Sequence, residues 1–163
     1  MQLLFAFCQW LENTAVGTSV RHSIWEFPVI ETVHLFGIIF LVGSSSIMDL
    51  RLMGLAFKQE KVSEMAHRTL PWAWTGIAIE VATGFLLFAS EATKLAHNQA
   101  FQLKMILIFL AGINVLVFHN LAYRSVGTWE QDVITPISAR IAGSLSLLLW
   151  IAIVSAGIWI PYF

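Results

Sequence analysis

The chain has 163 residues, of which 58% are hydrophobic and only 12% are charged, and its formal net charge is -1. A soluble domain averages about 25% charged residues, so this composition excludes a free-standing soluble domain and predicts an integral membrane protein about one domain long. A net charge of -1 also argues against nucleic acid, which requires a basic face. The single cysteine, Cys8, excludes an internal disulfide and a metal site built from several cysteines.

Residues 1–26 are predicted to form a short segment in the membrane interface. Five apolar residues fall on one face of a helix, namely Leu3, Leu4, Phe7, Cys8 and Leu11. Polar residues at Gln9, Glu12 and Asn13 interrupt this run, and no basic residue precedes it. This pattern argues against a cleavable signal peptide and favours an amphipathic helix lying in the outer interface.

Residues 27–163 contain four stretches that are long and apolar enough to cross a bilayer, which takes about 20 residues. They run approximately over residues 28–54, 70–89, 101–123 and 139–160. All four prolines are assigned to positions at or near the ends of these stretches, where proline is tolerated: Pro28, Pro71, Pro136 and Pro161. The predicted fold is an all-α integral membrane bundle of four transmembrane helices with a short N-terminal interfacial helix.

The nine basic residues are divided unequally between the two sides of this bundle. Six flank the first and third connections, namely Arg51, Lys58, Lys61, Arg68, Arg124 and Arg140. The other three are Arg21, Lys94 and Lys104. Because basic residues accumulate on the cytoplasmic side, we expect a multi-pass protein of the inner membrane with both termini on the periplasmic side.

Two polar residues fall near the predicted midplane, Glu80 in the second span and Asn114 in the third. Polar groups in hydrocarbon are costly and indicate function by default. A neutral Glu80 carboxyl could donate a hydrogen bond to Asn114, which would join two helices. In a functional interpretation, Glu80 is a proton relay or a quinone-contacting group and is the candidate catalytic residue, and Asn114 is a candidate cofactor-binding residue.

Four histidines on or near the spans predict haem b, whose iron takes one or two imidazole ligands. The helical rise places His34 roughly 9 Å and His97 roughly 20 Å outward of the span centres. It places His119 roughly 10 Å and His67 roughly 20 Å inward. His34 and His119 are the first candidates because both lie within the hydrocarbon, and His67 and His97 are candidates for the second position.

A metal site without haem is an alternative. Glu31-x-x-His34 and Glu64-x-x-His67 both have the Glu-x-x-His spacing used by metal sites in helix bundles. The two motifs are about 30 Å apart by helical rise, so any sites would be separate. Glu31, His34, Glu91 and His97 could take copper or zinc on the outer side. Glu64, His67 and His119 could do so on the inner side.

Several stretches resemble an uncharacterised bacterial family of four-span membrane proteins. They are the run from Glu31 to Gly43, the run from Asp49 to Gly54, Phe101-Gln-Leu-Lys-Met105, Gly112-Ile-Asn114 with Phe118-His119, and the last span through Trp150. More remotely, the histidine early in the first span and the lysine at the start of the third resemble CopD-type copper-resistance proteins. The same features are similar to four-helix di-haem cytochromes b and HemJ-type haem-pathway oxidases. The remote resemblance implies haem b or copper.

The sequence therefore predicts a membrane protein that binds haem b and transfers electrons, with a quinone or a redox partner subunit. One alternative is a copper-handling membrane protein of the CopD type. Another is a non-catalytic membrane subunit or anchor of a larger complex, in contact with lipid or with other copies of the chain. No nucleophile–base arrangement or glycine-rich phosphate loop supports a hydrolase or a nucleotide-binding enzyme.

Overall fold

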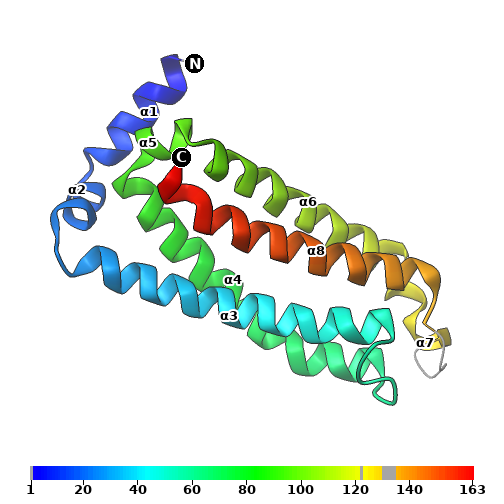
Figure 1. Ribbon diagram of the computed structural model, residues 1–163. Helices are drawn as coiled ribbons and strands as arrows, with labels where there is room; N and C mark the ends of the chain where they lie inside the picture. The colour runs from blue at the N-terminus through cyan, green and yellow to red at the C-terminus, as the bar shows by residue number, and fades with distance from the viewer. Residues whose placement is uncertain (1, 122, 130–134) are drawn as a thin grey trace.

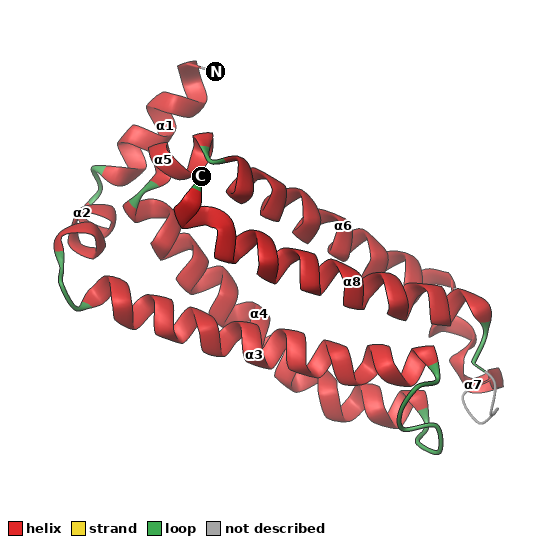
Figure 2. Ribbon diagram, in the orientation of Figure 1, coloured by secondary structure: helices red, strands yellow, loops and turns green. Residues whose placement is uncertain are grey.

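The computed structural model describes residues 2–121, 123–129 and 135–163, and every regular element among them is helical (Figure 2). Four long helices carry the predicted spans: α3 (Glu26–Met53), α4 (Val62–Ser90), α6 (Gln99–Leu121) and α8 (Ile137–Trp159). All four are long and apolar enough to cross a membrane. The predicted all-α architecture with four membrane-spanning helices is confirmed.

Shorter helices precede and connect these four spans. They are α1 (Gln2–Glu12), α2 (Ala15–His22), α5 (Ala92–His97) and α7 (Val126–Trp129). Two single turns of 3-10 helix, Tyr123–Ser125 and Ile160–Tyr162, complete the described elements. A short N-terminal helix is therefore present, as predicted.

The second span differs from its predicted start. It begins at Val62 rather than near residue 70, so Pro71 lies inside α4 and not in its first turn. Proline has no N–H group to donate, so one intrahelical hydrogen bond is missing at this position. The additional two turns carry Glu64, His67 and Arg68, all exposed. Hydropathy identifies only the apolar part of α4 and therefore omits this polar first part, although it is helical.

Short-range hydrogen bonds define both ends of α3. The Ser23 hydroxyl oxygen accepts from the backbone N–H groups of Trp25, at 3.3 Å, and Glu26, at 3.1 Å. Side-chain oxygens at this position satisfy N–H groups that have no partner within the helix. At the other end Gly54 adopts a left-handed conformation with φ of 71°, and its N–H donates to Arg51 O at 3.0 Å. Glycine is the residue that takes this conformation without strain.

Helix α3 is central to the packing of the bundle (Figure 1). It packs against α4 on one side and α8 on the other, and α8 in turn packs against α6. No Cα pair within 8 Å joins α4 to α6 among the described residues. These two helices meet through stacked rings, Phe88 against Phe101, with centroids 5.5 Å apart. Both chain ends lie at the same end of the bundle, beside α1 and α5 (Figure 1).

Glycines permit close approaches of α3 to α4 and of α3 to α8. A Cβ atom at Gly76 of α4 would lie 2.6 Å from Leu41 N of α3. A Cβ atom at Gly143 of α8 would lie 3.0 Å from both Asp49 O and Leu52 Cβ of α3. Small residues at such positions let backbones in membranes approach closely. The polar side chains of neighbouring helices can therefore reach one another.

Helix α1 is fixed to the corner between α4 and α5. Its Cys8 is fully buried with Leu11, Ala89 and Ala92. Its Glu12 carboxylate accepts hydrogen bonds from the Thr93 backbone N–H, at 2.7 Å, and from the Thr93 hydroxyl. The Glu12 carboxylate thus satisfies an otherwise unpaired N–H at the start of α5.

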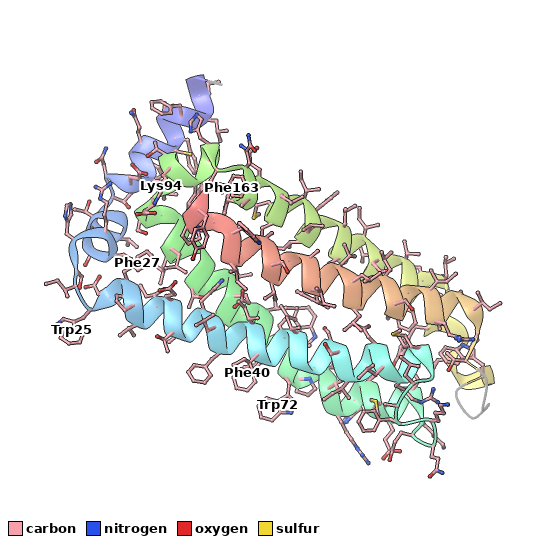
Figure 3. All side chains as sticks on the ribbon, viewed as in Figure 1. Trp25, Phe27, Phe40, Trp72, Lys94 and Phe163 are labelled. Atoms are coloured by element: carbon pink, nitrogen blue, oxygen red, sulfur yellow. The ribbon has the colours of Figure 1, made fainter. Side chains whose placement is uncertain are left out.

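The outer surface of the bundle is apolar. Large hydrophobic side chains of all four long helices are more than one-third exposed, among them Phe36, Val81, Phe109 and Leu148. Phe40 of α3 and Trp72 of α4 stack on this surface with centroids 5.5 Å apart (Figure 3). Such a surface in water would be highly unfavourable. It indicates contact with the lipid bilayer.

The contact between Glu12 and Thr93 should control how accessible the thiol of Cys8 is to reagents. Replacing Glu12 with Ala removes two hydrogen bonds to Thr93, so α1 should detach from the α4–α5 corner more often. We expect the rate of maleimide labelling of Cys8 to rise about tenfold, which corresponds to about 1.4 kcal/mol. Labelling followed by mass spectrometry measures this rate. Glu31→Ala, which changes an exposed carboxyl on α3, is the matched control and should label as slowly as the unmodified protein.

Candidate functional site

The most distinctive polar contact in the bundle joins α3 to α4. His34 of α3 lies with its Nε2 atom 3.2 Å from Glu80 Oε2 of α4. Its other ring nitrogen, Nδ1, is 2.8 Å from Thr83 Oγ1, also on α4. Glu80 and Thr83 are three residues apart and therefore share one face of their helix. A single imidazole ring thus bridges two side chains of the neighbouring span.

The hydrogen-bond partners of Thr83 determine where the protons of His34 lie. The Thr83 hydroxyl is 2.6 Å from Ile79 O, and a carbonyl can only accept, so the single hydroxyl proton points there. Thr83 Oγ1 must then accept from His34, which places a proton on Nδ1. A neutral His34 consequently has a bare lone pair on Nε2.

This lone pair faces a carboxyl oxygen. Two acceptors do not make a hydrogen bond, so the 3.2 Å contact between His34 Nε2 and Glu80 Oε2 requires one additional proton. That proton sits either on the Glu80 carboxyl, as a neutral pair, or on Nε2, as an ion pair. In both cases His34 and Glu80 hold one proton between them.

The second oxygen of Glu80 has no such partner. Glu80 Oε1 is buried and makes no hydrogen bond to any described residue. Gly37 of α3 leaves the space for it, because a Cβ atom at Gly37 would lie 2.5 Å from Oε1. An unpaired buried carboxylate oxygen is costly. The environment therefore disfavours a bare, charged Glu80.

Lys104 of α6 supplies a positive charge to the same site. It acts electrostatically on both His34 and Glu80. A Cβ atom at Gly157 of α8 would lie 3.4 Å from Lys104 Nζ, so the ammonium group lies against the backbone of the fourth span. All four long helices contribute to this site, which we call the His34–Glu80–Lys104 cluster.

The cluster lies in one half of the bundle. By helical rise, His34 is about 12 Å from the start of α3 and Glu80 about 15 Å from the end of α4. Lys104 is about 8 Å from the start of α6. These three helix ends lie at the same end of the bundle, which also carries α1, α2 and α5 (Figure 1). The site is therefore inside the spans and nearer to the end that carries both termini.

The predicted hydrogen bond between Glu80 and Asn114 is wrong. Glu80 meets His34 instead, and the Asn114 amide donates to Ala142 O of α8 at 3.0 Å. By helical rise Asn114 is about 22 Å from the start of α6, deeper than Glu80, and among the described residues no Cα pair within 8 Å joins α4 to α6. Depth alone cannot identify a partner when the neighbouring helix is unknown.

The other predicted histidine ligands are not brought to His34. His97 of α5 is exposed, with Nδ1 2.9 Å from Thr93 O. His67 of α4 is exposed beyond the apolar part of its helix. His119 is also exposed and stacks on Tyr123, with ring centroids 5.4 Å apart. The four histidines therefore lie at separate places, and none of the predicted ligand pairs is brought together.

The metal-ligand sets predicted from spacing do not assemble. Over residues 2–121, 123–129 and 135–163, no three His, Cys, Asp or Glu side chains form a group that could hold a metal ion. Glu31 and Glu64 are both exposed, and Glu64 accepts a 2.6 Å hydrogen bond from Arg68. The Glu-x-x-His spacings therefore do not build a metal centre in this fold.

Haem ligation through His34 does not fit this arrangement. An axial ligand needs a ring nitrogen free to bind iron, and both nitrogens of His34 are engaged, one by Thr83 and the other by Glu80. Haem binding would require the Glu80 contact to break. Haem b, and copper as its alternative, stay predictions of the sequence.

Two members of the site were missed as candidates from sequence. Thr83 is one residue among many hydroxyls, and only its position three residues after Glu80 marks it. The sequence identifies Lys104 as a basic residue near the start of the third span, but its position alone does not place it beside Glu80. A lysine well inside an apolar helix is itself a signal, because such a charge needs a partner.

The comparisons with known proteins place the chain in a family but give no function. A model of a family of unknown function, DUF6644, matches residues 7–163, and the chain belongs to this family. This agrees with the resemblance to an uncharacterised family. No curated protein and no solved structure matches the chain, and nothing found supports the remote resemblance to CopD-type proteins, cytochromes b or HemJ-type oxidases.

Two glycines beside the cluster predict opposite effects of the same substitution. Gly37→Ala introduces a methyl group 2.5 Å from Glu80 Oε1 and 2.8 Å from Ile79 Cγ2. Such overpacking costs about 1–3 kcal/mol and should lower the thermal unfolding midpoint of the detergent-solubilised protein.

Gly84→Ala is the matched control on the facing helix. Its added methyl group would lie 3.5 Å from His34 Cε1, which is an ordinary contact. Alanine is favoured over glycine inside a helix by about 0.5–1 kcal/mol, so the midpoint should stay or rise. Equal losses in both variants would contradict the described packing.

Proposed function

We propose that the protein is a proton-handling membrane protein whose working site is the His34–Glu80–Lys104 cluster. The observation that carries this proposal is the contact between His34 Nε2 and Glu80 Oε2, which requires one proton between two acceptors. Such pairs of ionisable groups inside a membrane are typical of proton relays. Glu80 is the residue that takes up and releases the proton.

Lys104 makes release of the proton feasible. With the proton bound, the His34–Glu80 pair has no net charge and Lys104 carries the single positive charge. When the proton leaves, Glu80 becomes a carboxylate whose charge the Lys104 ammonium offsets, since the two groups interact electrostatically. An isolated carboxylate in hydrocarbon would be far more costly. His34 orients Glu80 while the shared proton is bound, and Thr83 holds the ring of His34 in both states.

A proton site is compatible with the redox role that the sequence predicts. Quinones and other lipid-soluble carriers bind protons when they are reduced, so electron transfer in membranes commonly needs a protonatable side chain nearby. We propose that Glu80 serves a redox partner subunit or a quinone in this way. A purely structural role for the pair, as a link between α3 and α4, is the competing explanation.

We also propose that the cluster lies in the outer half of the inner membrane, with both termini on the periplasmic side. The support is the distribution of charge. The end opposite the termini carries Arg51, Lys58, Lys61 and Arg68, together with Arg124 and Arg140. Basic residues of short connections remain in the cytoplasm.

Infrared difference spectroscopy on protein reconstituted in vesicles tests the proposal. A proton exchanging at Glu80 should give a carboxylic-acid carbonyl band that appears on lowering the pH and disappears on raising it. Glu80→Gln should remove this band, because the amide cannot bind the proton. A visible spectrum of the same sample, reduced minus oxidised, reports whether haem b is present.

The matched control for this experiment is Glu64→Gln on the same helix. Glu64 is exposed and pairs with Arg68, so its replacement should leave the band unchanged. A reversible band lost only in Glu80→Gln supports proton exchange. A spectrum with no pH-dependent band assignable to Glu80 would mean that the pair is a structural link, and the proposed function would be wrong.

A further inference from the structure

A second buried carboxyl lies in the opposite half of the bundle. Asp49 of α3 is only 5% exposed, and its Oδ2 atom is buried without a hydrogen-bond partner among the described residues. Glu80 Oε1 is the other buried side-chain atom in the described part of the chain with this property. The two carboxyls share this property although the function proposed above uses only one of them.

The Asp49 side chain lies between α3 and α8. The side chain of Ser146 on α8 interacts with the Asp49 carboxyl. One turn away, a Cβ atom at Gly143 would lie 3.0 Å from Asp49 O and 3.5 Å from Asp49 Cα. This close approach of the two backbones keeps water and lipid away from the carboxyl.

Among the described residues, the charged groups on the helices packed around Asp49 are exposed or make contacts with other groups. Arg51, two residues along α3, donates from Nε to Glu60 O at 2.7 Å and from Nη1 to Thr135 Oγ1 at 3.2 Å. Arg140, which is the only charged residue of α8, is exposed. The ionisable residues in the first turns of α4 are exposed as well, namely Glu64, His67 and Arg68.

These surroundings favour a proton on Asp49. A buried carboxylate needs a cation or several donors to offset its loss of hydration. Asp49 interacts with the side chain of Ser146, and its Oδ2 atom has no hydrogen-bond partner among the described residues. A neutral carboxylic acid at the same place costs much less free energy.

The two carboxyls are separate sites. His34 and Asp49 are fifteen residues apart on α3, about 22 Å by helical rise. Two buried polar side chains at intermediate depth have committed their donors to backbone carbonyls. Ser44 donates to Phe40 O at 2.6 Å, and Asn114 donates to Ala142 O at 3.0 Å. The Ser44 hydroxyl and the Asn114 amide therefore do not link Asp49 to Glu80.

We propose that Asp49 is a second proton-binding site, independent of the His34–Glu80–Lys104 cluster and located at the opposite end of the bundle. The protein then carries one protonatable carboxyl in each half of the membrane. Each carboxyl exchanges its proton with the side of the membrane to which it is nearer. This inference rests on the contacts of Asp49 itself and not on the function proposed for Glu80.

Infrared spectra of four variants in vesicles test the proposal. Asp49→Asn should remove one carboxylic-acid band and leave the band assigned to Glu80. Ser146→Ala should shift the Asp49 band, because the interaction with the Ser146 side chain is lost, and it keeps the proposal testable if Asp49→Asn does not fold. Glu80→Gln should leave the Asp49 band in place.

Ser144→Ala on the same helix is the matched control. The Ser144 hydroxyl donates to Arg140 O of its own helix at 2.9 Å, so its removal should not change the Asp49 band. The proposal is overturned if Ser146→Ala and Ser144→Ala give the same spectrum as the unmodified protein. It is also overturned if Asp49→Asn removes no band. An Asp49 band without a Glu80 band would contradict only the function proposed for Glu80.

Discussion

The contact on which the site depends is the 3.2 Å approach of His34 Nε2 to Glu80 Oε2. Hydrocarbon offers no water to hydrate either group, so each must be satisfied within the protein. Because Thr83 donates its only proton to Ile79 O, it can serve His34 only as an acceptor. The chain of contacts from Ile79 O to Glu80 therefore fixes the direction of every hydrogen bond. It leaves one position, between the imidazole and the carboxyl, that an exchangeable proton must occupy.

The packing of the bundle makes this contact possible. Gly37 and Gly76 allow α3 and α4 to lie close together, and Gly37 also leaves room for the second oxygen of Glu80. The cluster then extends to α6 and α8 through the long side chain of Lys104, which lies against Gly157. Near the other end of α3, Gly143 of α8 allows the two helices to approach closely beside Asp49. Glycines thus determine where polar side chains can be buried between spans.

Much of this architecture could be predicted from the sequence, and the reason is physical. Hydropathy and length identify four spans. The depth predicted for Glu80 was too close to the midplane, because α4 begins at Val62 and not near residue 70, and Glu80 instead contacts His34. The partners could not be predicted. Depth gives one coordinate, whereas a contact also depends on which helices are neighbours and how each is rotated. For this reason the sequence predicts a hydrogen bond between Glu80 and Asn114, although the Asn114 amide donates to Ala142 O. The start of α4 was misplaced because Glu64, His67 and Arg68 are polar but helical.

Nitrogen-15 NMR of the histidine-labelled protein in bilayers tests the central claim most directly. The signals of His34 are assigned by their loss in His34→Gln. The structure predicts that Nδ1 of His34 carries a proton, and that Nε2 either accepts a hydrogen bond from Glu80 or is itself protonated. A neutral His34 with its proton on Nε2 and a bare Nδ1 would contradict the account. Thr83 would then donate to His34, and no shared proton would be needed between His34 and Glu80.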